Sequence, residues 1–240
     1  MEQFIYRDEN VSLDATGTRS VLLDGDEHFH LSRVLRIRTG EEVLVTNGAG
    51  KTLLCVVRSV GKDRTVCEVV REHDNLNSPR REFCIAVSLL KPVSKLETAV
   101  EKCTELGAAG FLLFKSERTE TVRPRLDRLE GIVRSAVKQS LRCRIPVLTF
   151  VENLGEAAAK GRSYNEKIVL HEKSENMISS HLSRMDAESS VIAMIGPEGG
   201  FSEAEIAFLN GNGYRSLSLG KARLRSETAA ITIASLLSVY

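Results

Sequence analysis

The chain has 240 residues, of which 42% are hydrophobic and 27% are charged, and its formal net charge is +1. This composition is typical of a globular protein with an apolar core, and the small net charge by itself argues against a strongly basic nucleic-acid binder. No apolar run approaches the ~18 residues of a membrane-spanning helix, and the first ten residues lack the apolar core of a signal peptide, so a cytoplasmic protein without membrane contact is expected.

The first 75 residues are predicted to be rich in β-strands. Short β-branched runs predict strands at 41–46, 51–60 and 64–72. The Asn47-Gly48 pair between the first two runs is a strong hairpin signal. A stretch before them, 26–40, has the pattern of a short helix. These elements together predict a small β-barrel or meander, and the polar segment 73–81 is the best candidate for a linker.

After the linker the pattern changes to alternating strands and helices. Apolar runs predict buried strands at 82–90, 110–116, 146–150, 166–172, 189–196 and 215–219. Helical patterns lie between them, and capping-box signatures at Ser94/Glu97 and Ser202/Glu205 predict where two of the helices begin. The alternation predicts an α/β domain with a mainly parallel sheet, in which ligands bind beyond the carboxyl ends of the strands.

The cysteines and histidines give little support for a disulfide framework or a metal site. There are five cysteines, no two of which form a Cys-x-x-Cys pair, and the five histidines include no His-Glu-x-x-His motif. We expect the cysteines to be small buried side chains and expect no metal cofactor.

Basic residues are concentrated in one part of the chain. Residues 115–144 hold nine lysines and arginines against four acidic residues. A local basic patch matters more for binding a polyanion than the total charge does. The alternative is an ordinary solvated helix face.

The segment 195–205, IGPEGGFSEAE, predicts a tight glycine-rich loop between a buried strand and a capped helix. Glycines at such a turn let backbone groups approach a ligand closely. The loop is neither a Walker motif, which needs Gly-Lys-Ser/Thr, nor a Rossmann Gly-x-Gly-x-x-Gly fingerprint. The alternative is a simple connecting turn.

The segment 219–230, LGKARLRSETAA, leads from the last strand into an apolar helix that Ser226 or Thr228 can cap. Arg225 and Glu227 place charges where this buried helix begins, so they are expected to be functional or to pair with each other. His171, which follows another strand, is on its own most simply an ordinary polar residue.

No nucleophile constellation is present. The chain has no Gly-x-Ser-x-Gly elbow, no Ser-x-x-Lys motif and no cysteine near a plausible base. Direct transfer from a bound, activated cofactor is a chemistry that needs neither a nucleophile nor a metal.

Several motifs together resemble the ribosomal small-subunit RNA methyltransferase E family. They are HLSRVLRIRTGEEVLVTNGAG, KCTELG, SERT, AVKQSLRCRIPVL, IGPEGGFSEAE and LGKARLRSETAA, and they span nearly the whole chain. The resemblance implies an S-adenosylmethionine-dependent enzyme of the SPOUT superfamily that methylates N3 of a uridine in 16S rRNA of the small ribosomal subunit. It also implies a PUA-like β-barrel at 1–75, an α/β domain with a C-terminal trefoil knot at 76–240, and a homodimer.

Carried over position by position, the resemblance assigns the cofactor to three loops. The implied S-adenosylmethionine-binding residues are Leu170, His171, Glu172, Gly196, Pro197, Glu198, Gly199, Gly200, Leu219, Gly220, Leu224, Arg225, Thr228 and Ala229. The sequence departs from the family outside these loops. It has Leu96 and Glu97 in a stretch where members often have aspartate or tryptophan, and it has Leu141 where members commonly have glycine.

Roles in the implied reaction follow from the chemistry of uracil. Loss of the N3 proton spreads negative charge over the ring carbonyl oxygens, which a guanidinium can stabilise, and Arg225 is the candidate. Glu227 either orients Arg225 or receives the proton, and Glu198 is the other carboxylate that could receive it. RNA contacts are expected from arginines of the barrel and of the basic segment. These are Arg33, Arg36, Arg38, Arg118, Arg123 and Arg142.

Two other functions remain open at this point. A non-catalytic RNA-binding assembly factor could keep the same shape, and adenosylmethionine binding would argue against it. A metabolic enzyme on an ordinary doubly wound sheet would need neither the barrel nor the basic segment.

Overall fold

The computed structural model describes residues 1–15, 17–120 and 123–239, and the chain divides into two units. The first unit consists of residues 1–78 and 137–145, and the second consists of 79–136 and 146–240. A single boundary after residue 75 was the expectation from sequence. The structure differs because the chain returns to the first unit between β8 and β9, the second and third strands of the second unit.

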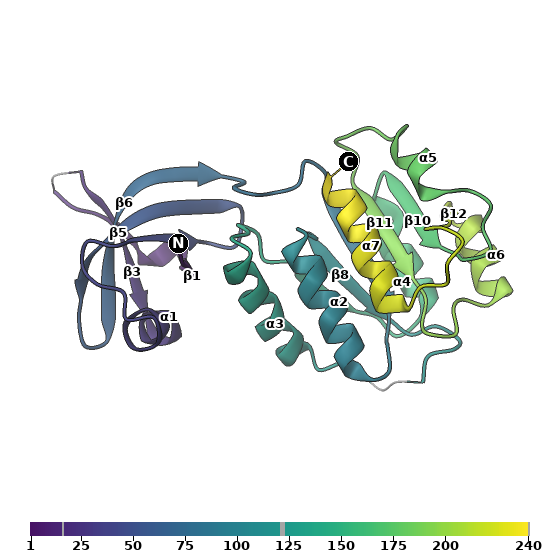
Figure 1. Cartoon of the computed structure of the whole chain (residues 1–240), viewed down its shortest axis with the longest axis horizontal. Coiled ribbons are helices and arrows are strands. Elements are labelled where there is room, and N and C mark those ends of the chain that lie inside the picture. The colour runs from purple at the N-terminus through teal and green to yellow at the C-terminus, as the bar shows by residue number, and fades with distance from the viewer. Residues whose placement is uncertain (16, 121–122, 240) are drawn as a thin grey trace. The chain divides into compact units, whose positions relative to one another are not determined.

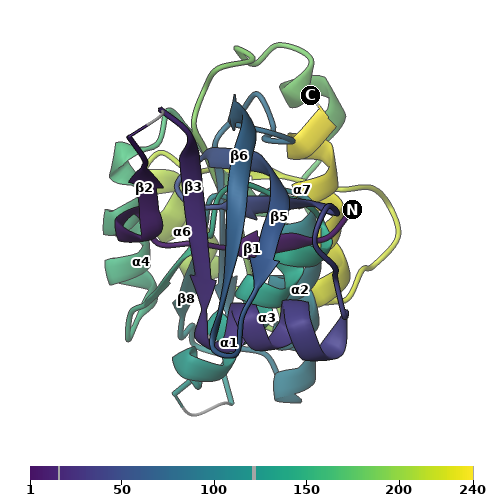
Figure 2. The same cartoon turned by 90° about the vertical axis from the view of Figure 1, so that its left-hand side faces the viewer.

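The first unit contains a mostly antiparallel sheet in the order β1-β4-β5-β6-β3-β2, and only the β1–β4 pair is parallel. Its strands are β1 (Gln3–Ile5), β2 (Val11–Leu13), β3 (Arg19–Asp24), β4 (Glu42–Thr46), β5 (Lys51–Val60) and β6 (Arg64–Asp74). The last three match the expected strands. Figure 2 shows β3, β6 and β5 side by side. Fully buried residues such as Phe4, Leu31 and Leu53 form the core of this unit.

The helix expected at 26–40 is shorter in the structure. α1 (Gly25–Phe29) runs into a single π-helical stretch, η2 (His30–Val34), and Arg36 then takes a left-handed backbone conformation with φ of 55°. A left-handed residue cannot continue a right-handed helix, so the segment ends there.

The returning segment 137–145 is fixed to the first unit by hydrogen bonds. Gln3 Nε2 donates to the carbonyl of Arg142 at 2.7 Å, and Thr46 Oγ1 donates to the carbonyl of Cys143 at 3.1 Å. Leu141 has φ of 55° in this segment. Glycine would adopt that conformation without strain.

The second unit is an α/β domain with a parallel sheet in the order β12-β10-β11-β7-β8-β9, as the alternating pattern predicts. Its strands are β7 (Phe83–Ser88), β8 (Gly110–Phe114), β9 (Val147–Phe150), β10 (Glu166–Leu170), β11 (Val191–Ile195) and β12 (Arg215–Leu217). Its helices are α2 (Val93–Glu105), α3 (Leu126–Gln139), α4 (Leu154–Lys160), α5 (Ile178–Leu182), α6 (Glu203–Gly211) and α7 (Ser226–Val239). The last residues of α3 are counted with the first unit.

Helices cover both faces of this sheet (Figures 1 and 2). α2 and α7 pack on each other, and α7 also lies against β7 and β11. α4 and α6 pack in a second cluster with alternate residues of the same strands, including Ala86 and Met194. The centre of the sheet is therefore fully buried, which explains the unbroken apolar runs in β7, β8 and β11.

One of the two expected capping boxes is wrong. α2 begins at Val93, directly after Pro92, so Ser94 lies inside its first turn. Glu97 instead accepts a hydrogen bond from Arg128 Nη2 of α3 at 2.9 Å. The signature fails because a helix can begin after proline without a side-chain cap.

The described residues contain no helix that is long and apolar enough to cross a membrane. They also contain no group of three or more histidine, cysteine or acidic side chains placed to hold a metal ion.

All five cysteines are buried and unpaired, as expected. Burial raises the pKa of Cys55 and Cys67 to about 12 and that of Cys84 to about 11. Because the thiolate is the reactive form, the folded protein should react with a thiol reagent such as Ellman's reagent far more slowly than free cysteine does. Five thiols should react after denaturation. Rapid reaction of one thiol in the folded protein would contradict this prediction.

Candidate functional site

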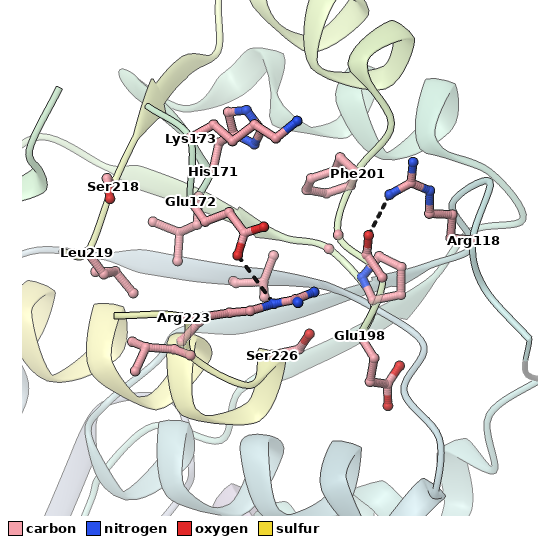
Figure 3. A pocket seen from close by; sticks show the side chains of 18 of the residues that line it. Arg118, His171, Glu172, Lys173, Glu198, Phe201, Ser218, Leu219, Arg223 and Ser226 are labelled. Atoms are coloured by element: carbon pink, nitrogen blue, oxygen red, sulfur yellow. Dashed lines mark hydrogen bonds and ion pairs between the residues drawn. The ribbon is translucent and has the colours of Figure 1, made fainter. Parts of the chain in front are cut away.

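A cavity of about 270 Å³ lies in the second unit, where three loops follow the carboxyl ends of β10, β11 and β12. Figure 3 shows side chains from these loops surrounding it. The lining residues are Arg118, Leu170, His171, Glu172, Lys173, Ile195, Gly196, Pro197, Glu198, Gly199, Gly200, Phe201, Glu203, Ser218, Leu219, Gly220, Ala222, Arg223, Leu224, Ser226 and Ala229. This is the edge at which parallel sheets bind ligands.

The loop after β11 is a tight turn that depends on glycine. Gly200 has φ of 66°, and its N–H donates to the carbonyl of Pro197 at 2.9 Å. A Cβ added to Gly196 would lie only 3.1 Å from the backbone nitrogen of Phe201. The predicted capping box is confirmed directly after this turn, since Ser202 and Glu205 exchange reciprocal hydrogen bonds at the start of α6.

The loops after β12 and β10 meet across the cavity. Gly220 has φ of 138°, and its N–H donates to Ser218 Oγ at 3.2 Å. Arg223 Nε lies 3.4 Å from Glu172 Oε2, an ion pair that links the two loops (Figure 3). His171 lines the cavity as well, and its backbone N–H donates to the carbonyl of Leu217 at 2.9 Å.

These walls suit an organic cofactor. Leu170, Ile195 and Phe201 provide apolar surface, while Glu172 and Glu203 provide carboxylates that can accept hydrogen bonds from hydroxyl or ammonium groups. An added Cβ at either Gly200 or Gly220 would meet no atom within 4 Å, so crowding is not the reason for glycine there. The reason for glycine at both positions is the positive φ angle, and without a side chain the backbone stays accessible to a ligand.

Glu198 lines the cavity, but its carboxylate points away from it (Figure 3). The carboxylate accepts hydrogen bonds from the backbone N–H of Lys91 at 2.9 Å and from Lys95 Nζ at 3.1 Å. Burial raises the pKa of Glu198, but its own backbone N–H, that of Lys91 and the Lys95 ammonium outweigh burial and hold the pKa below its usual value. A carboxylate with a lowered pKa is a weak proton acceptor.

Arg225 and Glu227 lie at the start of α7, next to the cavity but outside its lining. Arg225 is exposed, and it makes no ion pair with any residue that the structure describes, so pairing with Glu227 is not observed. Glu227 Oε2 is buried and has no hydrogen-bond partner among the described residues. Thr228 is exposed and also lies outside the lining.

All the other predicted cofactor residues line the cavity. The predicted loops span 170–172, 196–200 and 219–229, and the third also contains the lining residues Ala222, Arg223 and Ser226, which were not singled out. Reasoning from sequence missed lining residues directly beside the loops, and widening the loops by a few residues would have found them; these are Lys173, Ile195, Phe201, Glu203 and Ser218. Arg118 is different, because it comes from the loop after β8.

The six arginines predicted to contact RNA have different surroundings. Arg33, Arg36 and Arg38 are exposed in the first unit. Arg123 pairs with Glu152 at 3.1 Å and lies over the ring of Phe150. Arg142 is partly buried, and its guanidinium donates to the carbonyl of Asn77. Arg118 lies at the cavity itself.

Comparison with known proteins identifies relatives over nearly the whole chain. A family model described as RNA methyltransferase domain matches residues 77–238, and one described as RNA methyltransferase PUA domain matches 23–70. The chain is 34% identical over 232 residues to the ribosomal RNA small subunit methyltransferase E of Mycobacterium tuberculosis, covering 91% of this chain and 86% of that protein. It is 28% identical over 228 residues to the Bacillus subtilis protein of the same name, with 90% and 88% covered.

Solved structures agree with this result. A ribosomal RNA small subunit methyltransferase E from Neisseria gonorrhoeae, bound to S-adenosyl methionine, superposes with a TM-score of 0.85 at 26% identity and covers 99% of this chain and 96% of its own. A Legionella pneumophila methyltransferase in complex with the cofactor SAM gives a TM-score of 0.82 at 25% identity, with the same coverage.

Proposed function

The chain belongs to the ribosomal RNA small subunit methyltransferase E family, and on this premise we propose that it transfers a methyl group from S-adenosylmethionine to N3 of a uridine in 16S rRNA of the small subunit. The observation that carries the proposal is the cavity beyond β10, β11 and β12. It brings together three loops that are far apart in the sequence and that match the family's motifs. Relatives with bound S-adenosylmethionine support the choice of cofactor.

The residues present fit this cofactor. The apolar side chains of the cavity would hold its adenine ring, and the carboxylates of Glu172 and Glu203 could accept hydrogen bonds from its hydroxyl and ammonium groups. When bound, the cofactor supplies a methyl group that is already activated for transfer. The protein therefore has to position the acceptor and stabilise the charge that develops on it.

The acceptor nitrogen has to lose a proton before it can react, and the resulting negative charge spreads over the uracil carbonyl oxygens. Arg225 is suited to stabilise this charge, because its guanidinium is exposed beside the cavity and is not neutralised by an acidic partner among the described residues. Of the two acidic residues proposed for the proton, Glu227 is the better choice. Its Oε2 is buried without a partner, whereas Glu198 is turned toward Lys95.

The direct test is methyl transfer from labelled S-adenosylmethionine to small ribosomal subunits that lack their uridine methylation, followed by mapping of the product. We expect label at N3 of one uridine. If the cofactor binds but no label is transferred, either the RNA substrate is wrong or the protein is a non-catalytic assembly factor. If neither binding nor transfer is found, the proposal fails.

We expect binding to ribosomal RNA to weaken steeply with salt. Four of the predicted arginines are exposed and would contact phosphates, namely Arg33, Arg36, Arg38 and Arg118. Each phosphate contact releases about one counterion. Four such contacts would lower the association constant by roughly two orders of magnitude between 50 and 200 mM salt. The measurement is a filter-binding titration at several salt concentrations. An affinity that does not change with salt would contradict these assignments.

We also propose that the protein acts in the cytoplasm as a homodimer and that its C-terminal segment forms a trefoil knot. The strand order supports the knot, because β10 lies between β11 and β12 and the loops after all three strands converge on one cavity. Sedimentation equilibrium would give the mass of two chains if the dimer is correct and of one chain if it is wrong.

A further inference from the structure

The loop between β8 and the following segment, residues 115–119, makes two contacts with the region around the glycine-rich loop. The backbone N–H of Glu117 donates to Glu205 Oε1 at 2.8 Å. Arg118 Nη1 donates to the carbonyl of Gly199 at 2.6 Å, the contact that is drawn in Figure 3. The first contact holds the backbone of the loop, and the second places a guanidinium at the cavity.

The carboxylate of Glu205 does more than cap its own helix. Only 9% of this residue is exposed, and each of its oxygens accepts a backbone hydrogen bond. Oε2 accepts from Ser202 at 2.9 Å, which completes the capping box, while Oε1 accepts from Glu117, which lies 88 positions away in the sequence. A capping box requires only the first of these bonds.

The opposite side of the 115–119 loop is fixed to the sheet. Thr119 Oγ1 accepts from the backbone N–H of Ser116 at 2.9 Å and lies 2.7 Å from the fully buried hydroxyl of Ser88 on β7. The loop is thus held between β7 and the start of α6, and Arg118 lies between its two fixed points.

We propose that Glu205 is a positioning residue whose buried carboxylate holds the 115–119 loop against the glycine-rich loop, so that Arg118 braces the Gly199 carbonyl at the cavity. The proposal rests on the proposed function in one respect, since the cavity is taken to bind S-adenosylmethionine. Without the Glu205 bond, the 115–119 loop keeps its attachment to β7 but loses the one to α6. The hydrogen bond from Arg118 to the Gly199 carbonyl then weakens, and the cavity loses its shape.

Glu205→Gln separates this role from capping. Glutamine also serves in a capping box, but its amide offers only one acceptor oxygen. Either Ser202 or Glu117 therefore faces an NH₂ group in place of an acceptor, and loss of a buried hydrogen bond of this kind changes an equilibrium by roughly tenfold.

Glu156→Gln is the matched control. Glu156 occupies the corresponding position in the first turn of α4 and is exposed; Asn153 Oδ1 accepts from its N–H at 2.9 Å, and the Asn153 side-chain amide Nδ2 donates to its Oε1 at 2.8 Å. Its remaining bond, from the N–H of Glu152 at 3.3 Å, is local. The chemical change is the same, but it lies outside the cavity.

The first experiment measures amide hydrogen exchange of the full chain without cofactor. Glu205→Gln should speed exchange in residues 115–119 and 196–201 about tenfold, while Glu156→Gln leaves both segments unchanged and both variants remain folded. Unchanged exchange in Glu205→Gln would overturn the proposal. This measurement needs neither the cofactor nor RNA, so it stays decisive even if the proposed function is wrong.

The second experiment is a double-mutant cycle on the Kd for S-adenosylmethionine, measured by calorimetry. If Glu205 acts through Arg118, Glu205→Gln should raise the Kd about tenfold in the parent chain and less than twofold in an Arg118→Ala background. Equal factors in both backgrounds would show that Glu205 does not act through Arg118 and would overturn that step. A parent chain that binds no S-adenosylmethionine would defeat the proposed function and leave the exchange result to decide the role of Glu205.

Discussion

Replacing Arg225 with alanine is expected to reduce the rate of methyl transfer by about two to three orders of magnitude, the usual effect of losing one group that stabilises transition-state charge. The Kd for S-adenosylmethionine should stay within a few-fold, because Arg225 lies beside the cavity and is not part of its lining. The side chain is exposed, so folding should be unaffected. The measurement is single-turnover transfer to unmethylated small subunits, together with calorimetric cofactor binding.

Three further variants make this test specific. Arg162→Ala removes an exposed arginine of the same unit, away from the cavity, and should transfer at the parental rate. Arg225→Lys keeps the charge but loses the planar fork of donors, so an intermediate rate is expected. A parental rate in Arg225→Ala combined with a large loss in Arg223→Ala would move the role to Arg223, which is at present paired with Glu172.

The second large effect is expected at Gly220. Its φ of 138° belongs to a region that residues with a side chain rarely adopt, and holding another residue there costs about 1–3 kcal/mol. Gly220→Val should therefore distort the loop after β12 and weaken S-adenosylmethionine binding by roughly 10- to 100-fold. Calorimetric titration measures this, and circular dichroism verifies that the sheet is retained.

Gly40→Val is the control for that substitution. Gly40 also has a positive φ, 93°, with no atom within 4 Å of an added Cβ, but it lies in the first unit. The backbone strain is of the same kind, so stability should fall while cofactor binding is retained. Equal loss of binding in both variants would mean that Gly220 matters for global stability and not for the cavity.

The strands and helices of the second unit could be predicted well because they depend on two local signals, the apolar run of a buried strand and the cap of a helix. Strands such as β7 and β11 are continuous apolar runs, and α6 begins at a genuine capping box. In the first unit, β1, β2 and β3 were not individually predicted. β1 and β2 have only three residues each, too few to show a period, and β1 pairs with β4, which is remote in the sequence.

The part of the candidate site that could be predicted consists of the residues that lie directly after the carboxyl ends of strands. The three loops could be anticipated because parallel strands direct their carboxyl ends to one edge of the sheet. Arg118 at the cavity could not, since its position depends on the Glu205 carboxylate 88 positions after Glu117 in the sequence. The direction of the Glu198 carboxylate likewise depends on Lys91 and Lys95, which no pattern in the glycine-rich loop indicates.

The return of residues 137–145 to the first unit limits how this protein can be divided. One cut after residue 78 would give an N-terminal fragment that lacks the segment bonded to Gln3 and Thr46. The remaining fragment would carry that segment without its partners. Neither piece is therefore a self-sufficient module. Exchange of the N-terminal domain alone would not give a complete first unit, because a donor domain would also have to supply its own version of 137–145, which includes the last residues of α3.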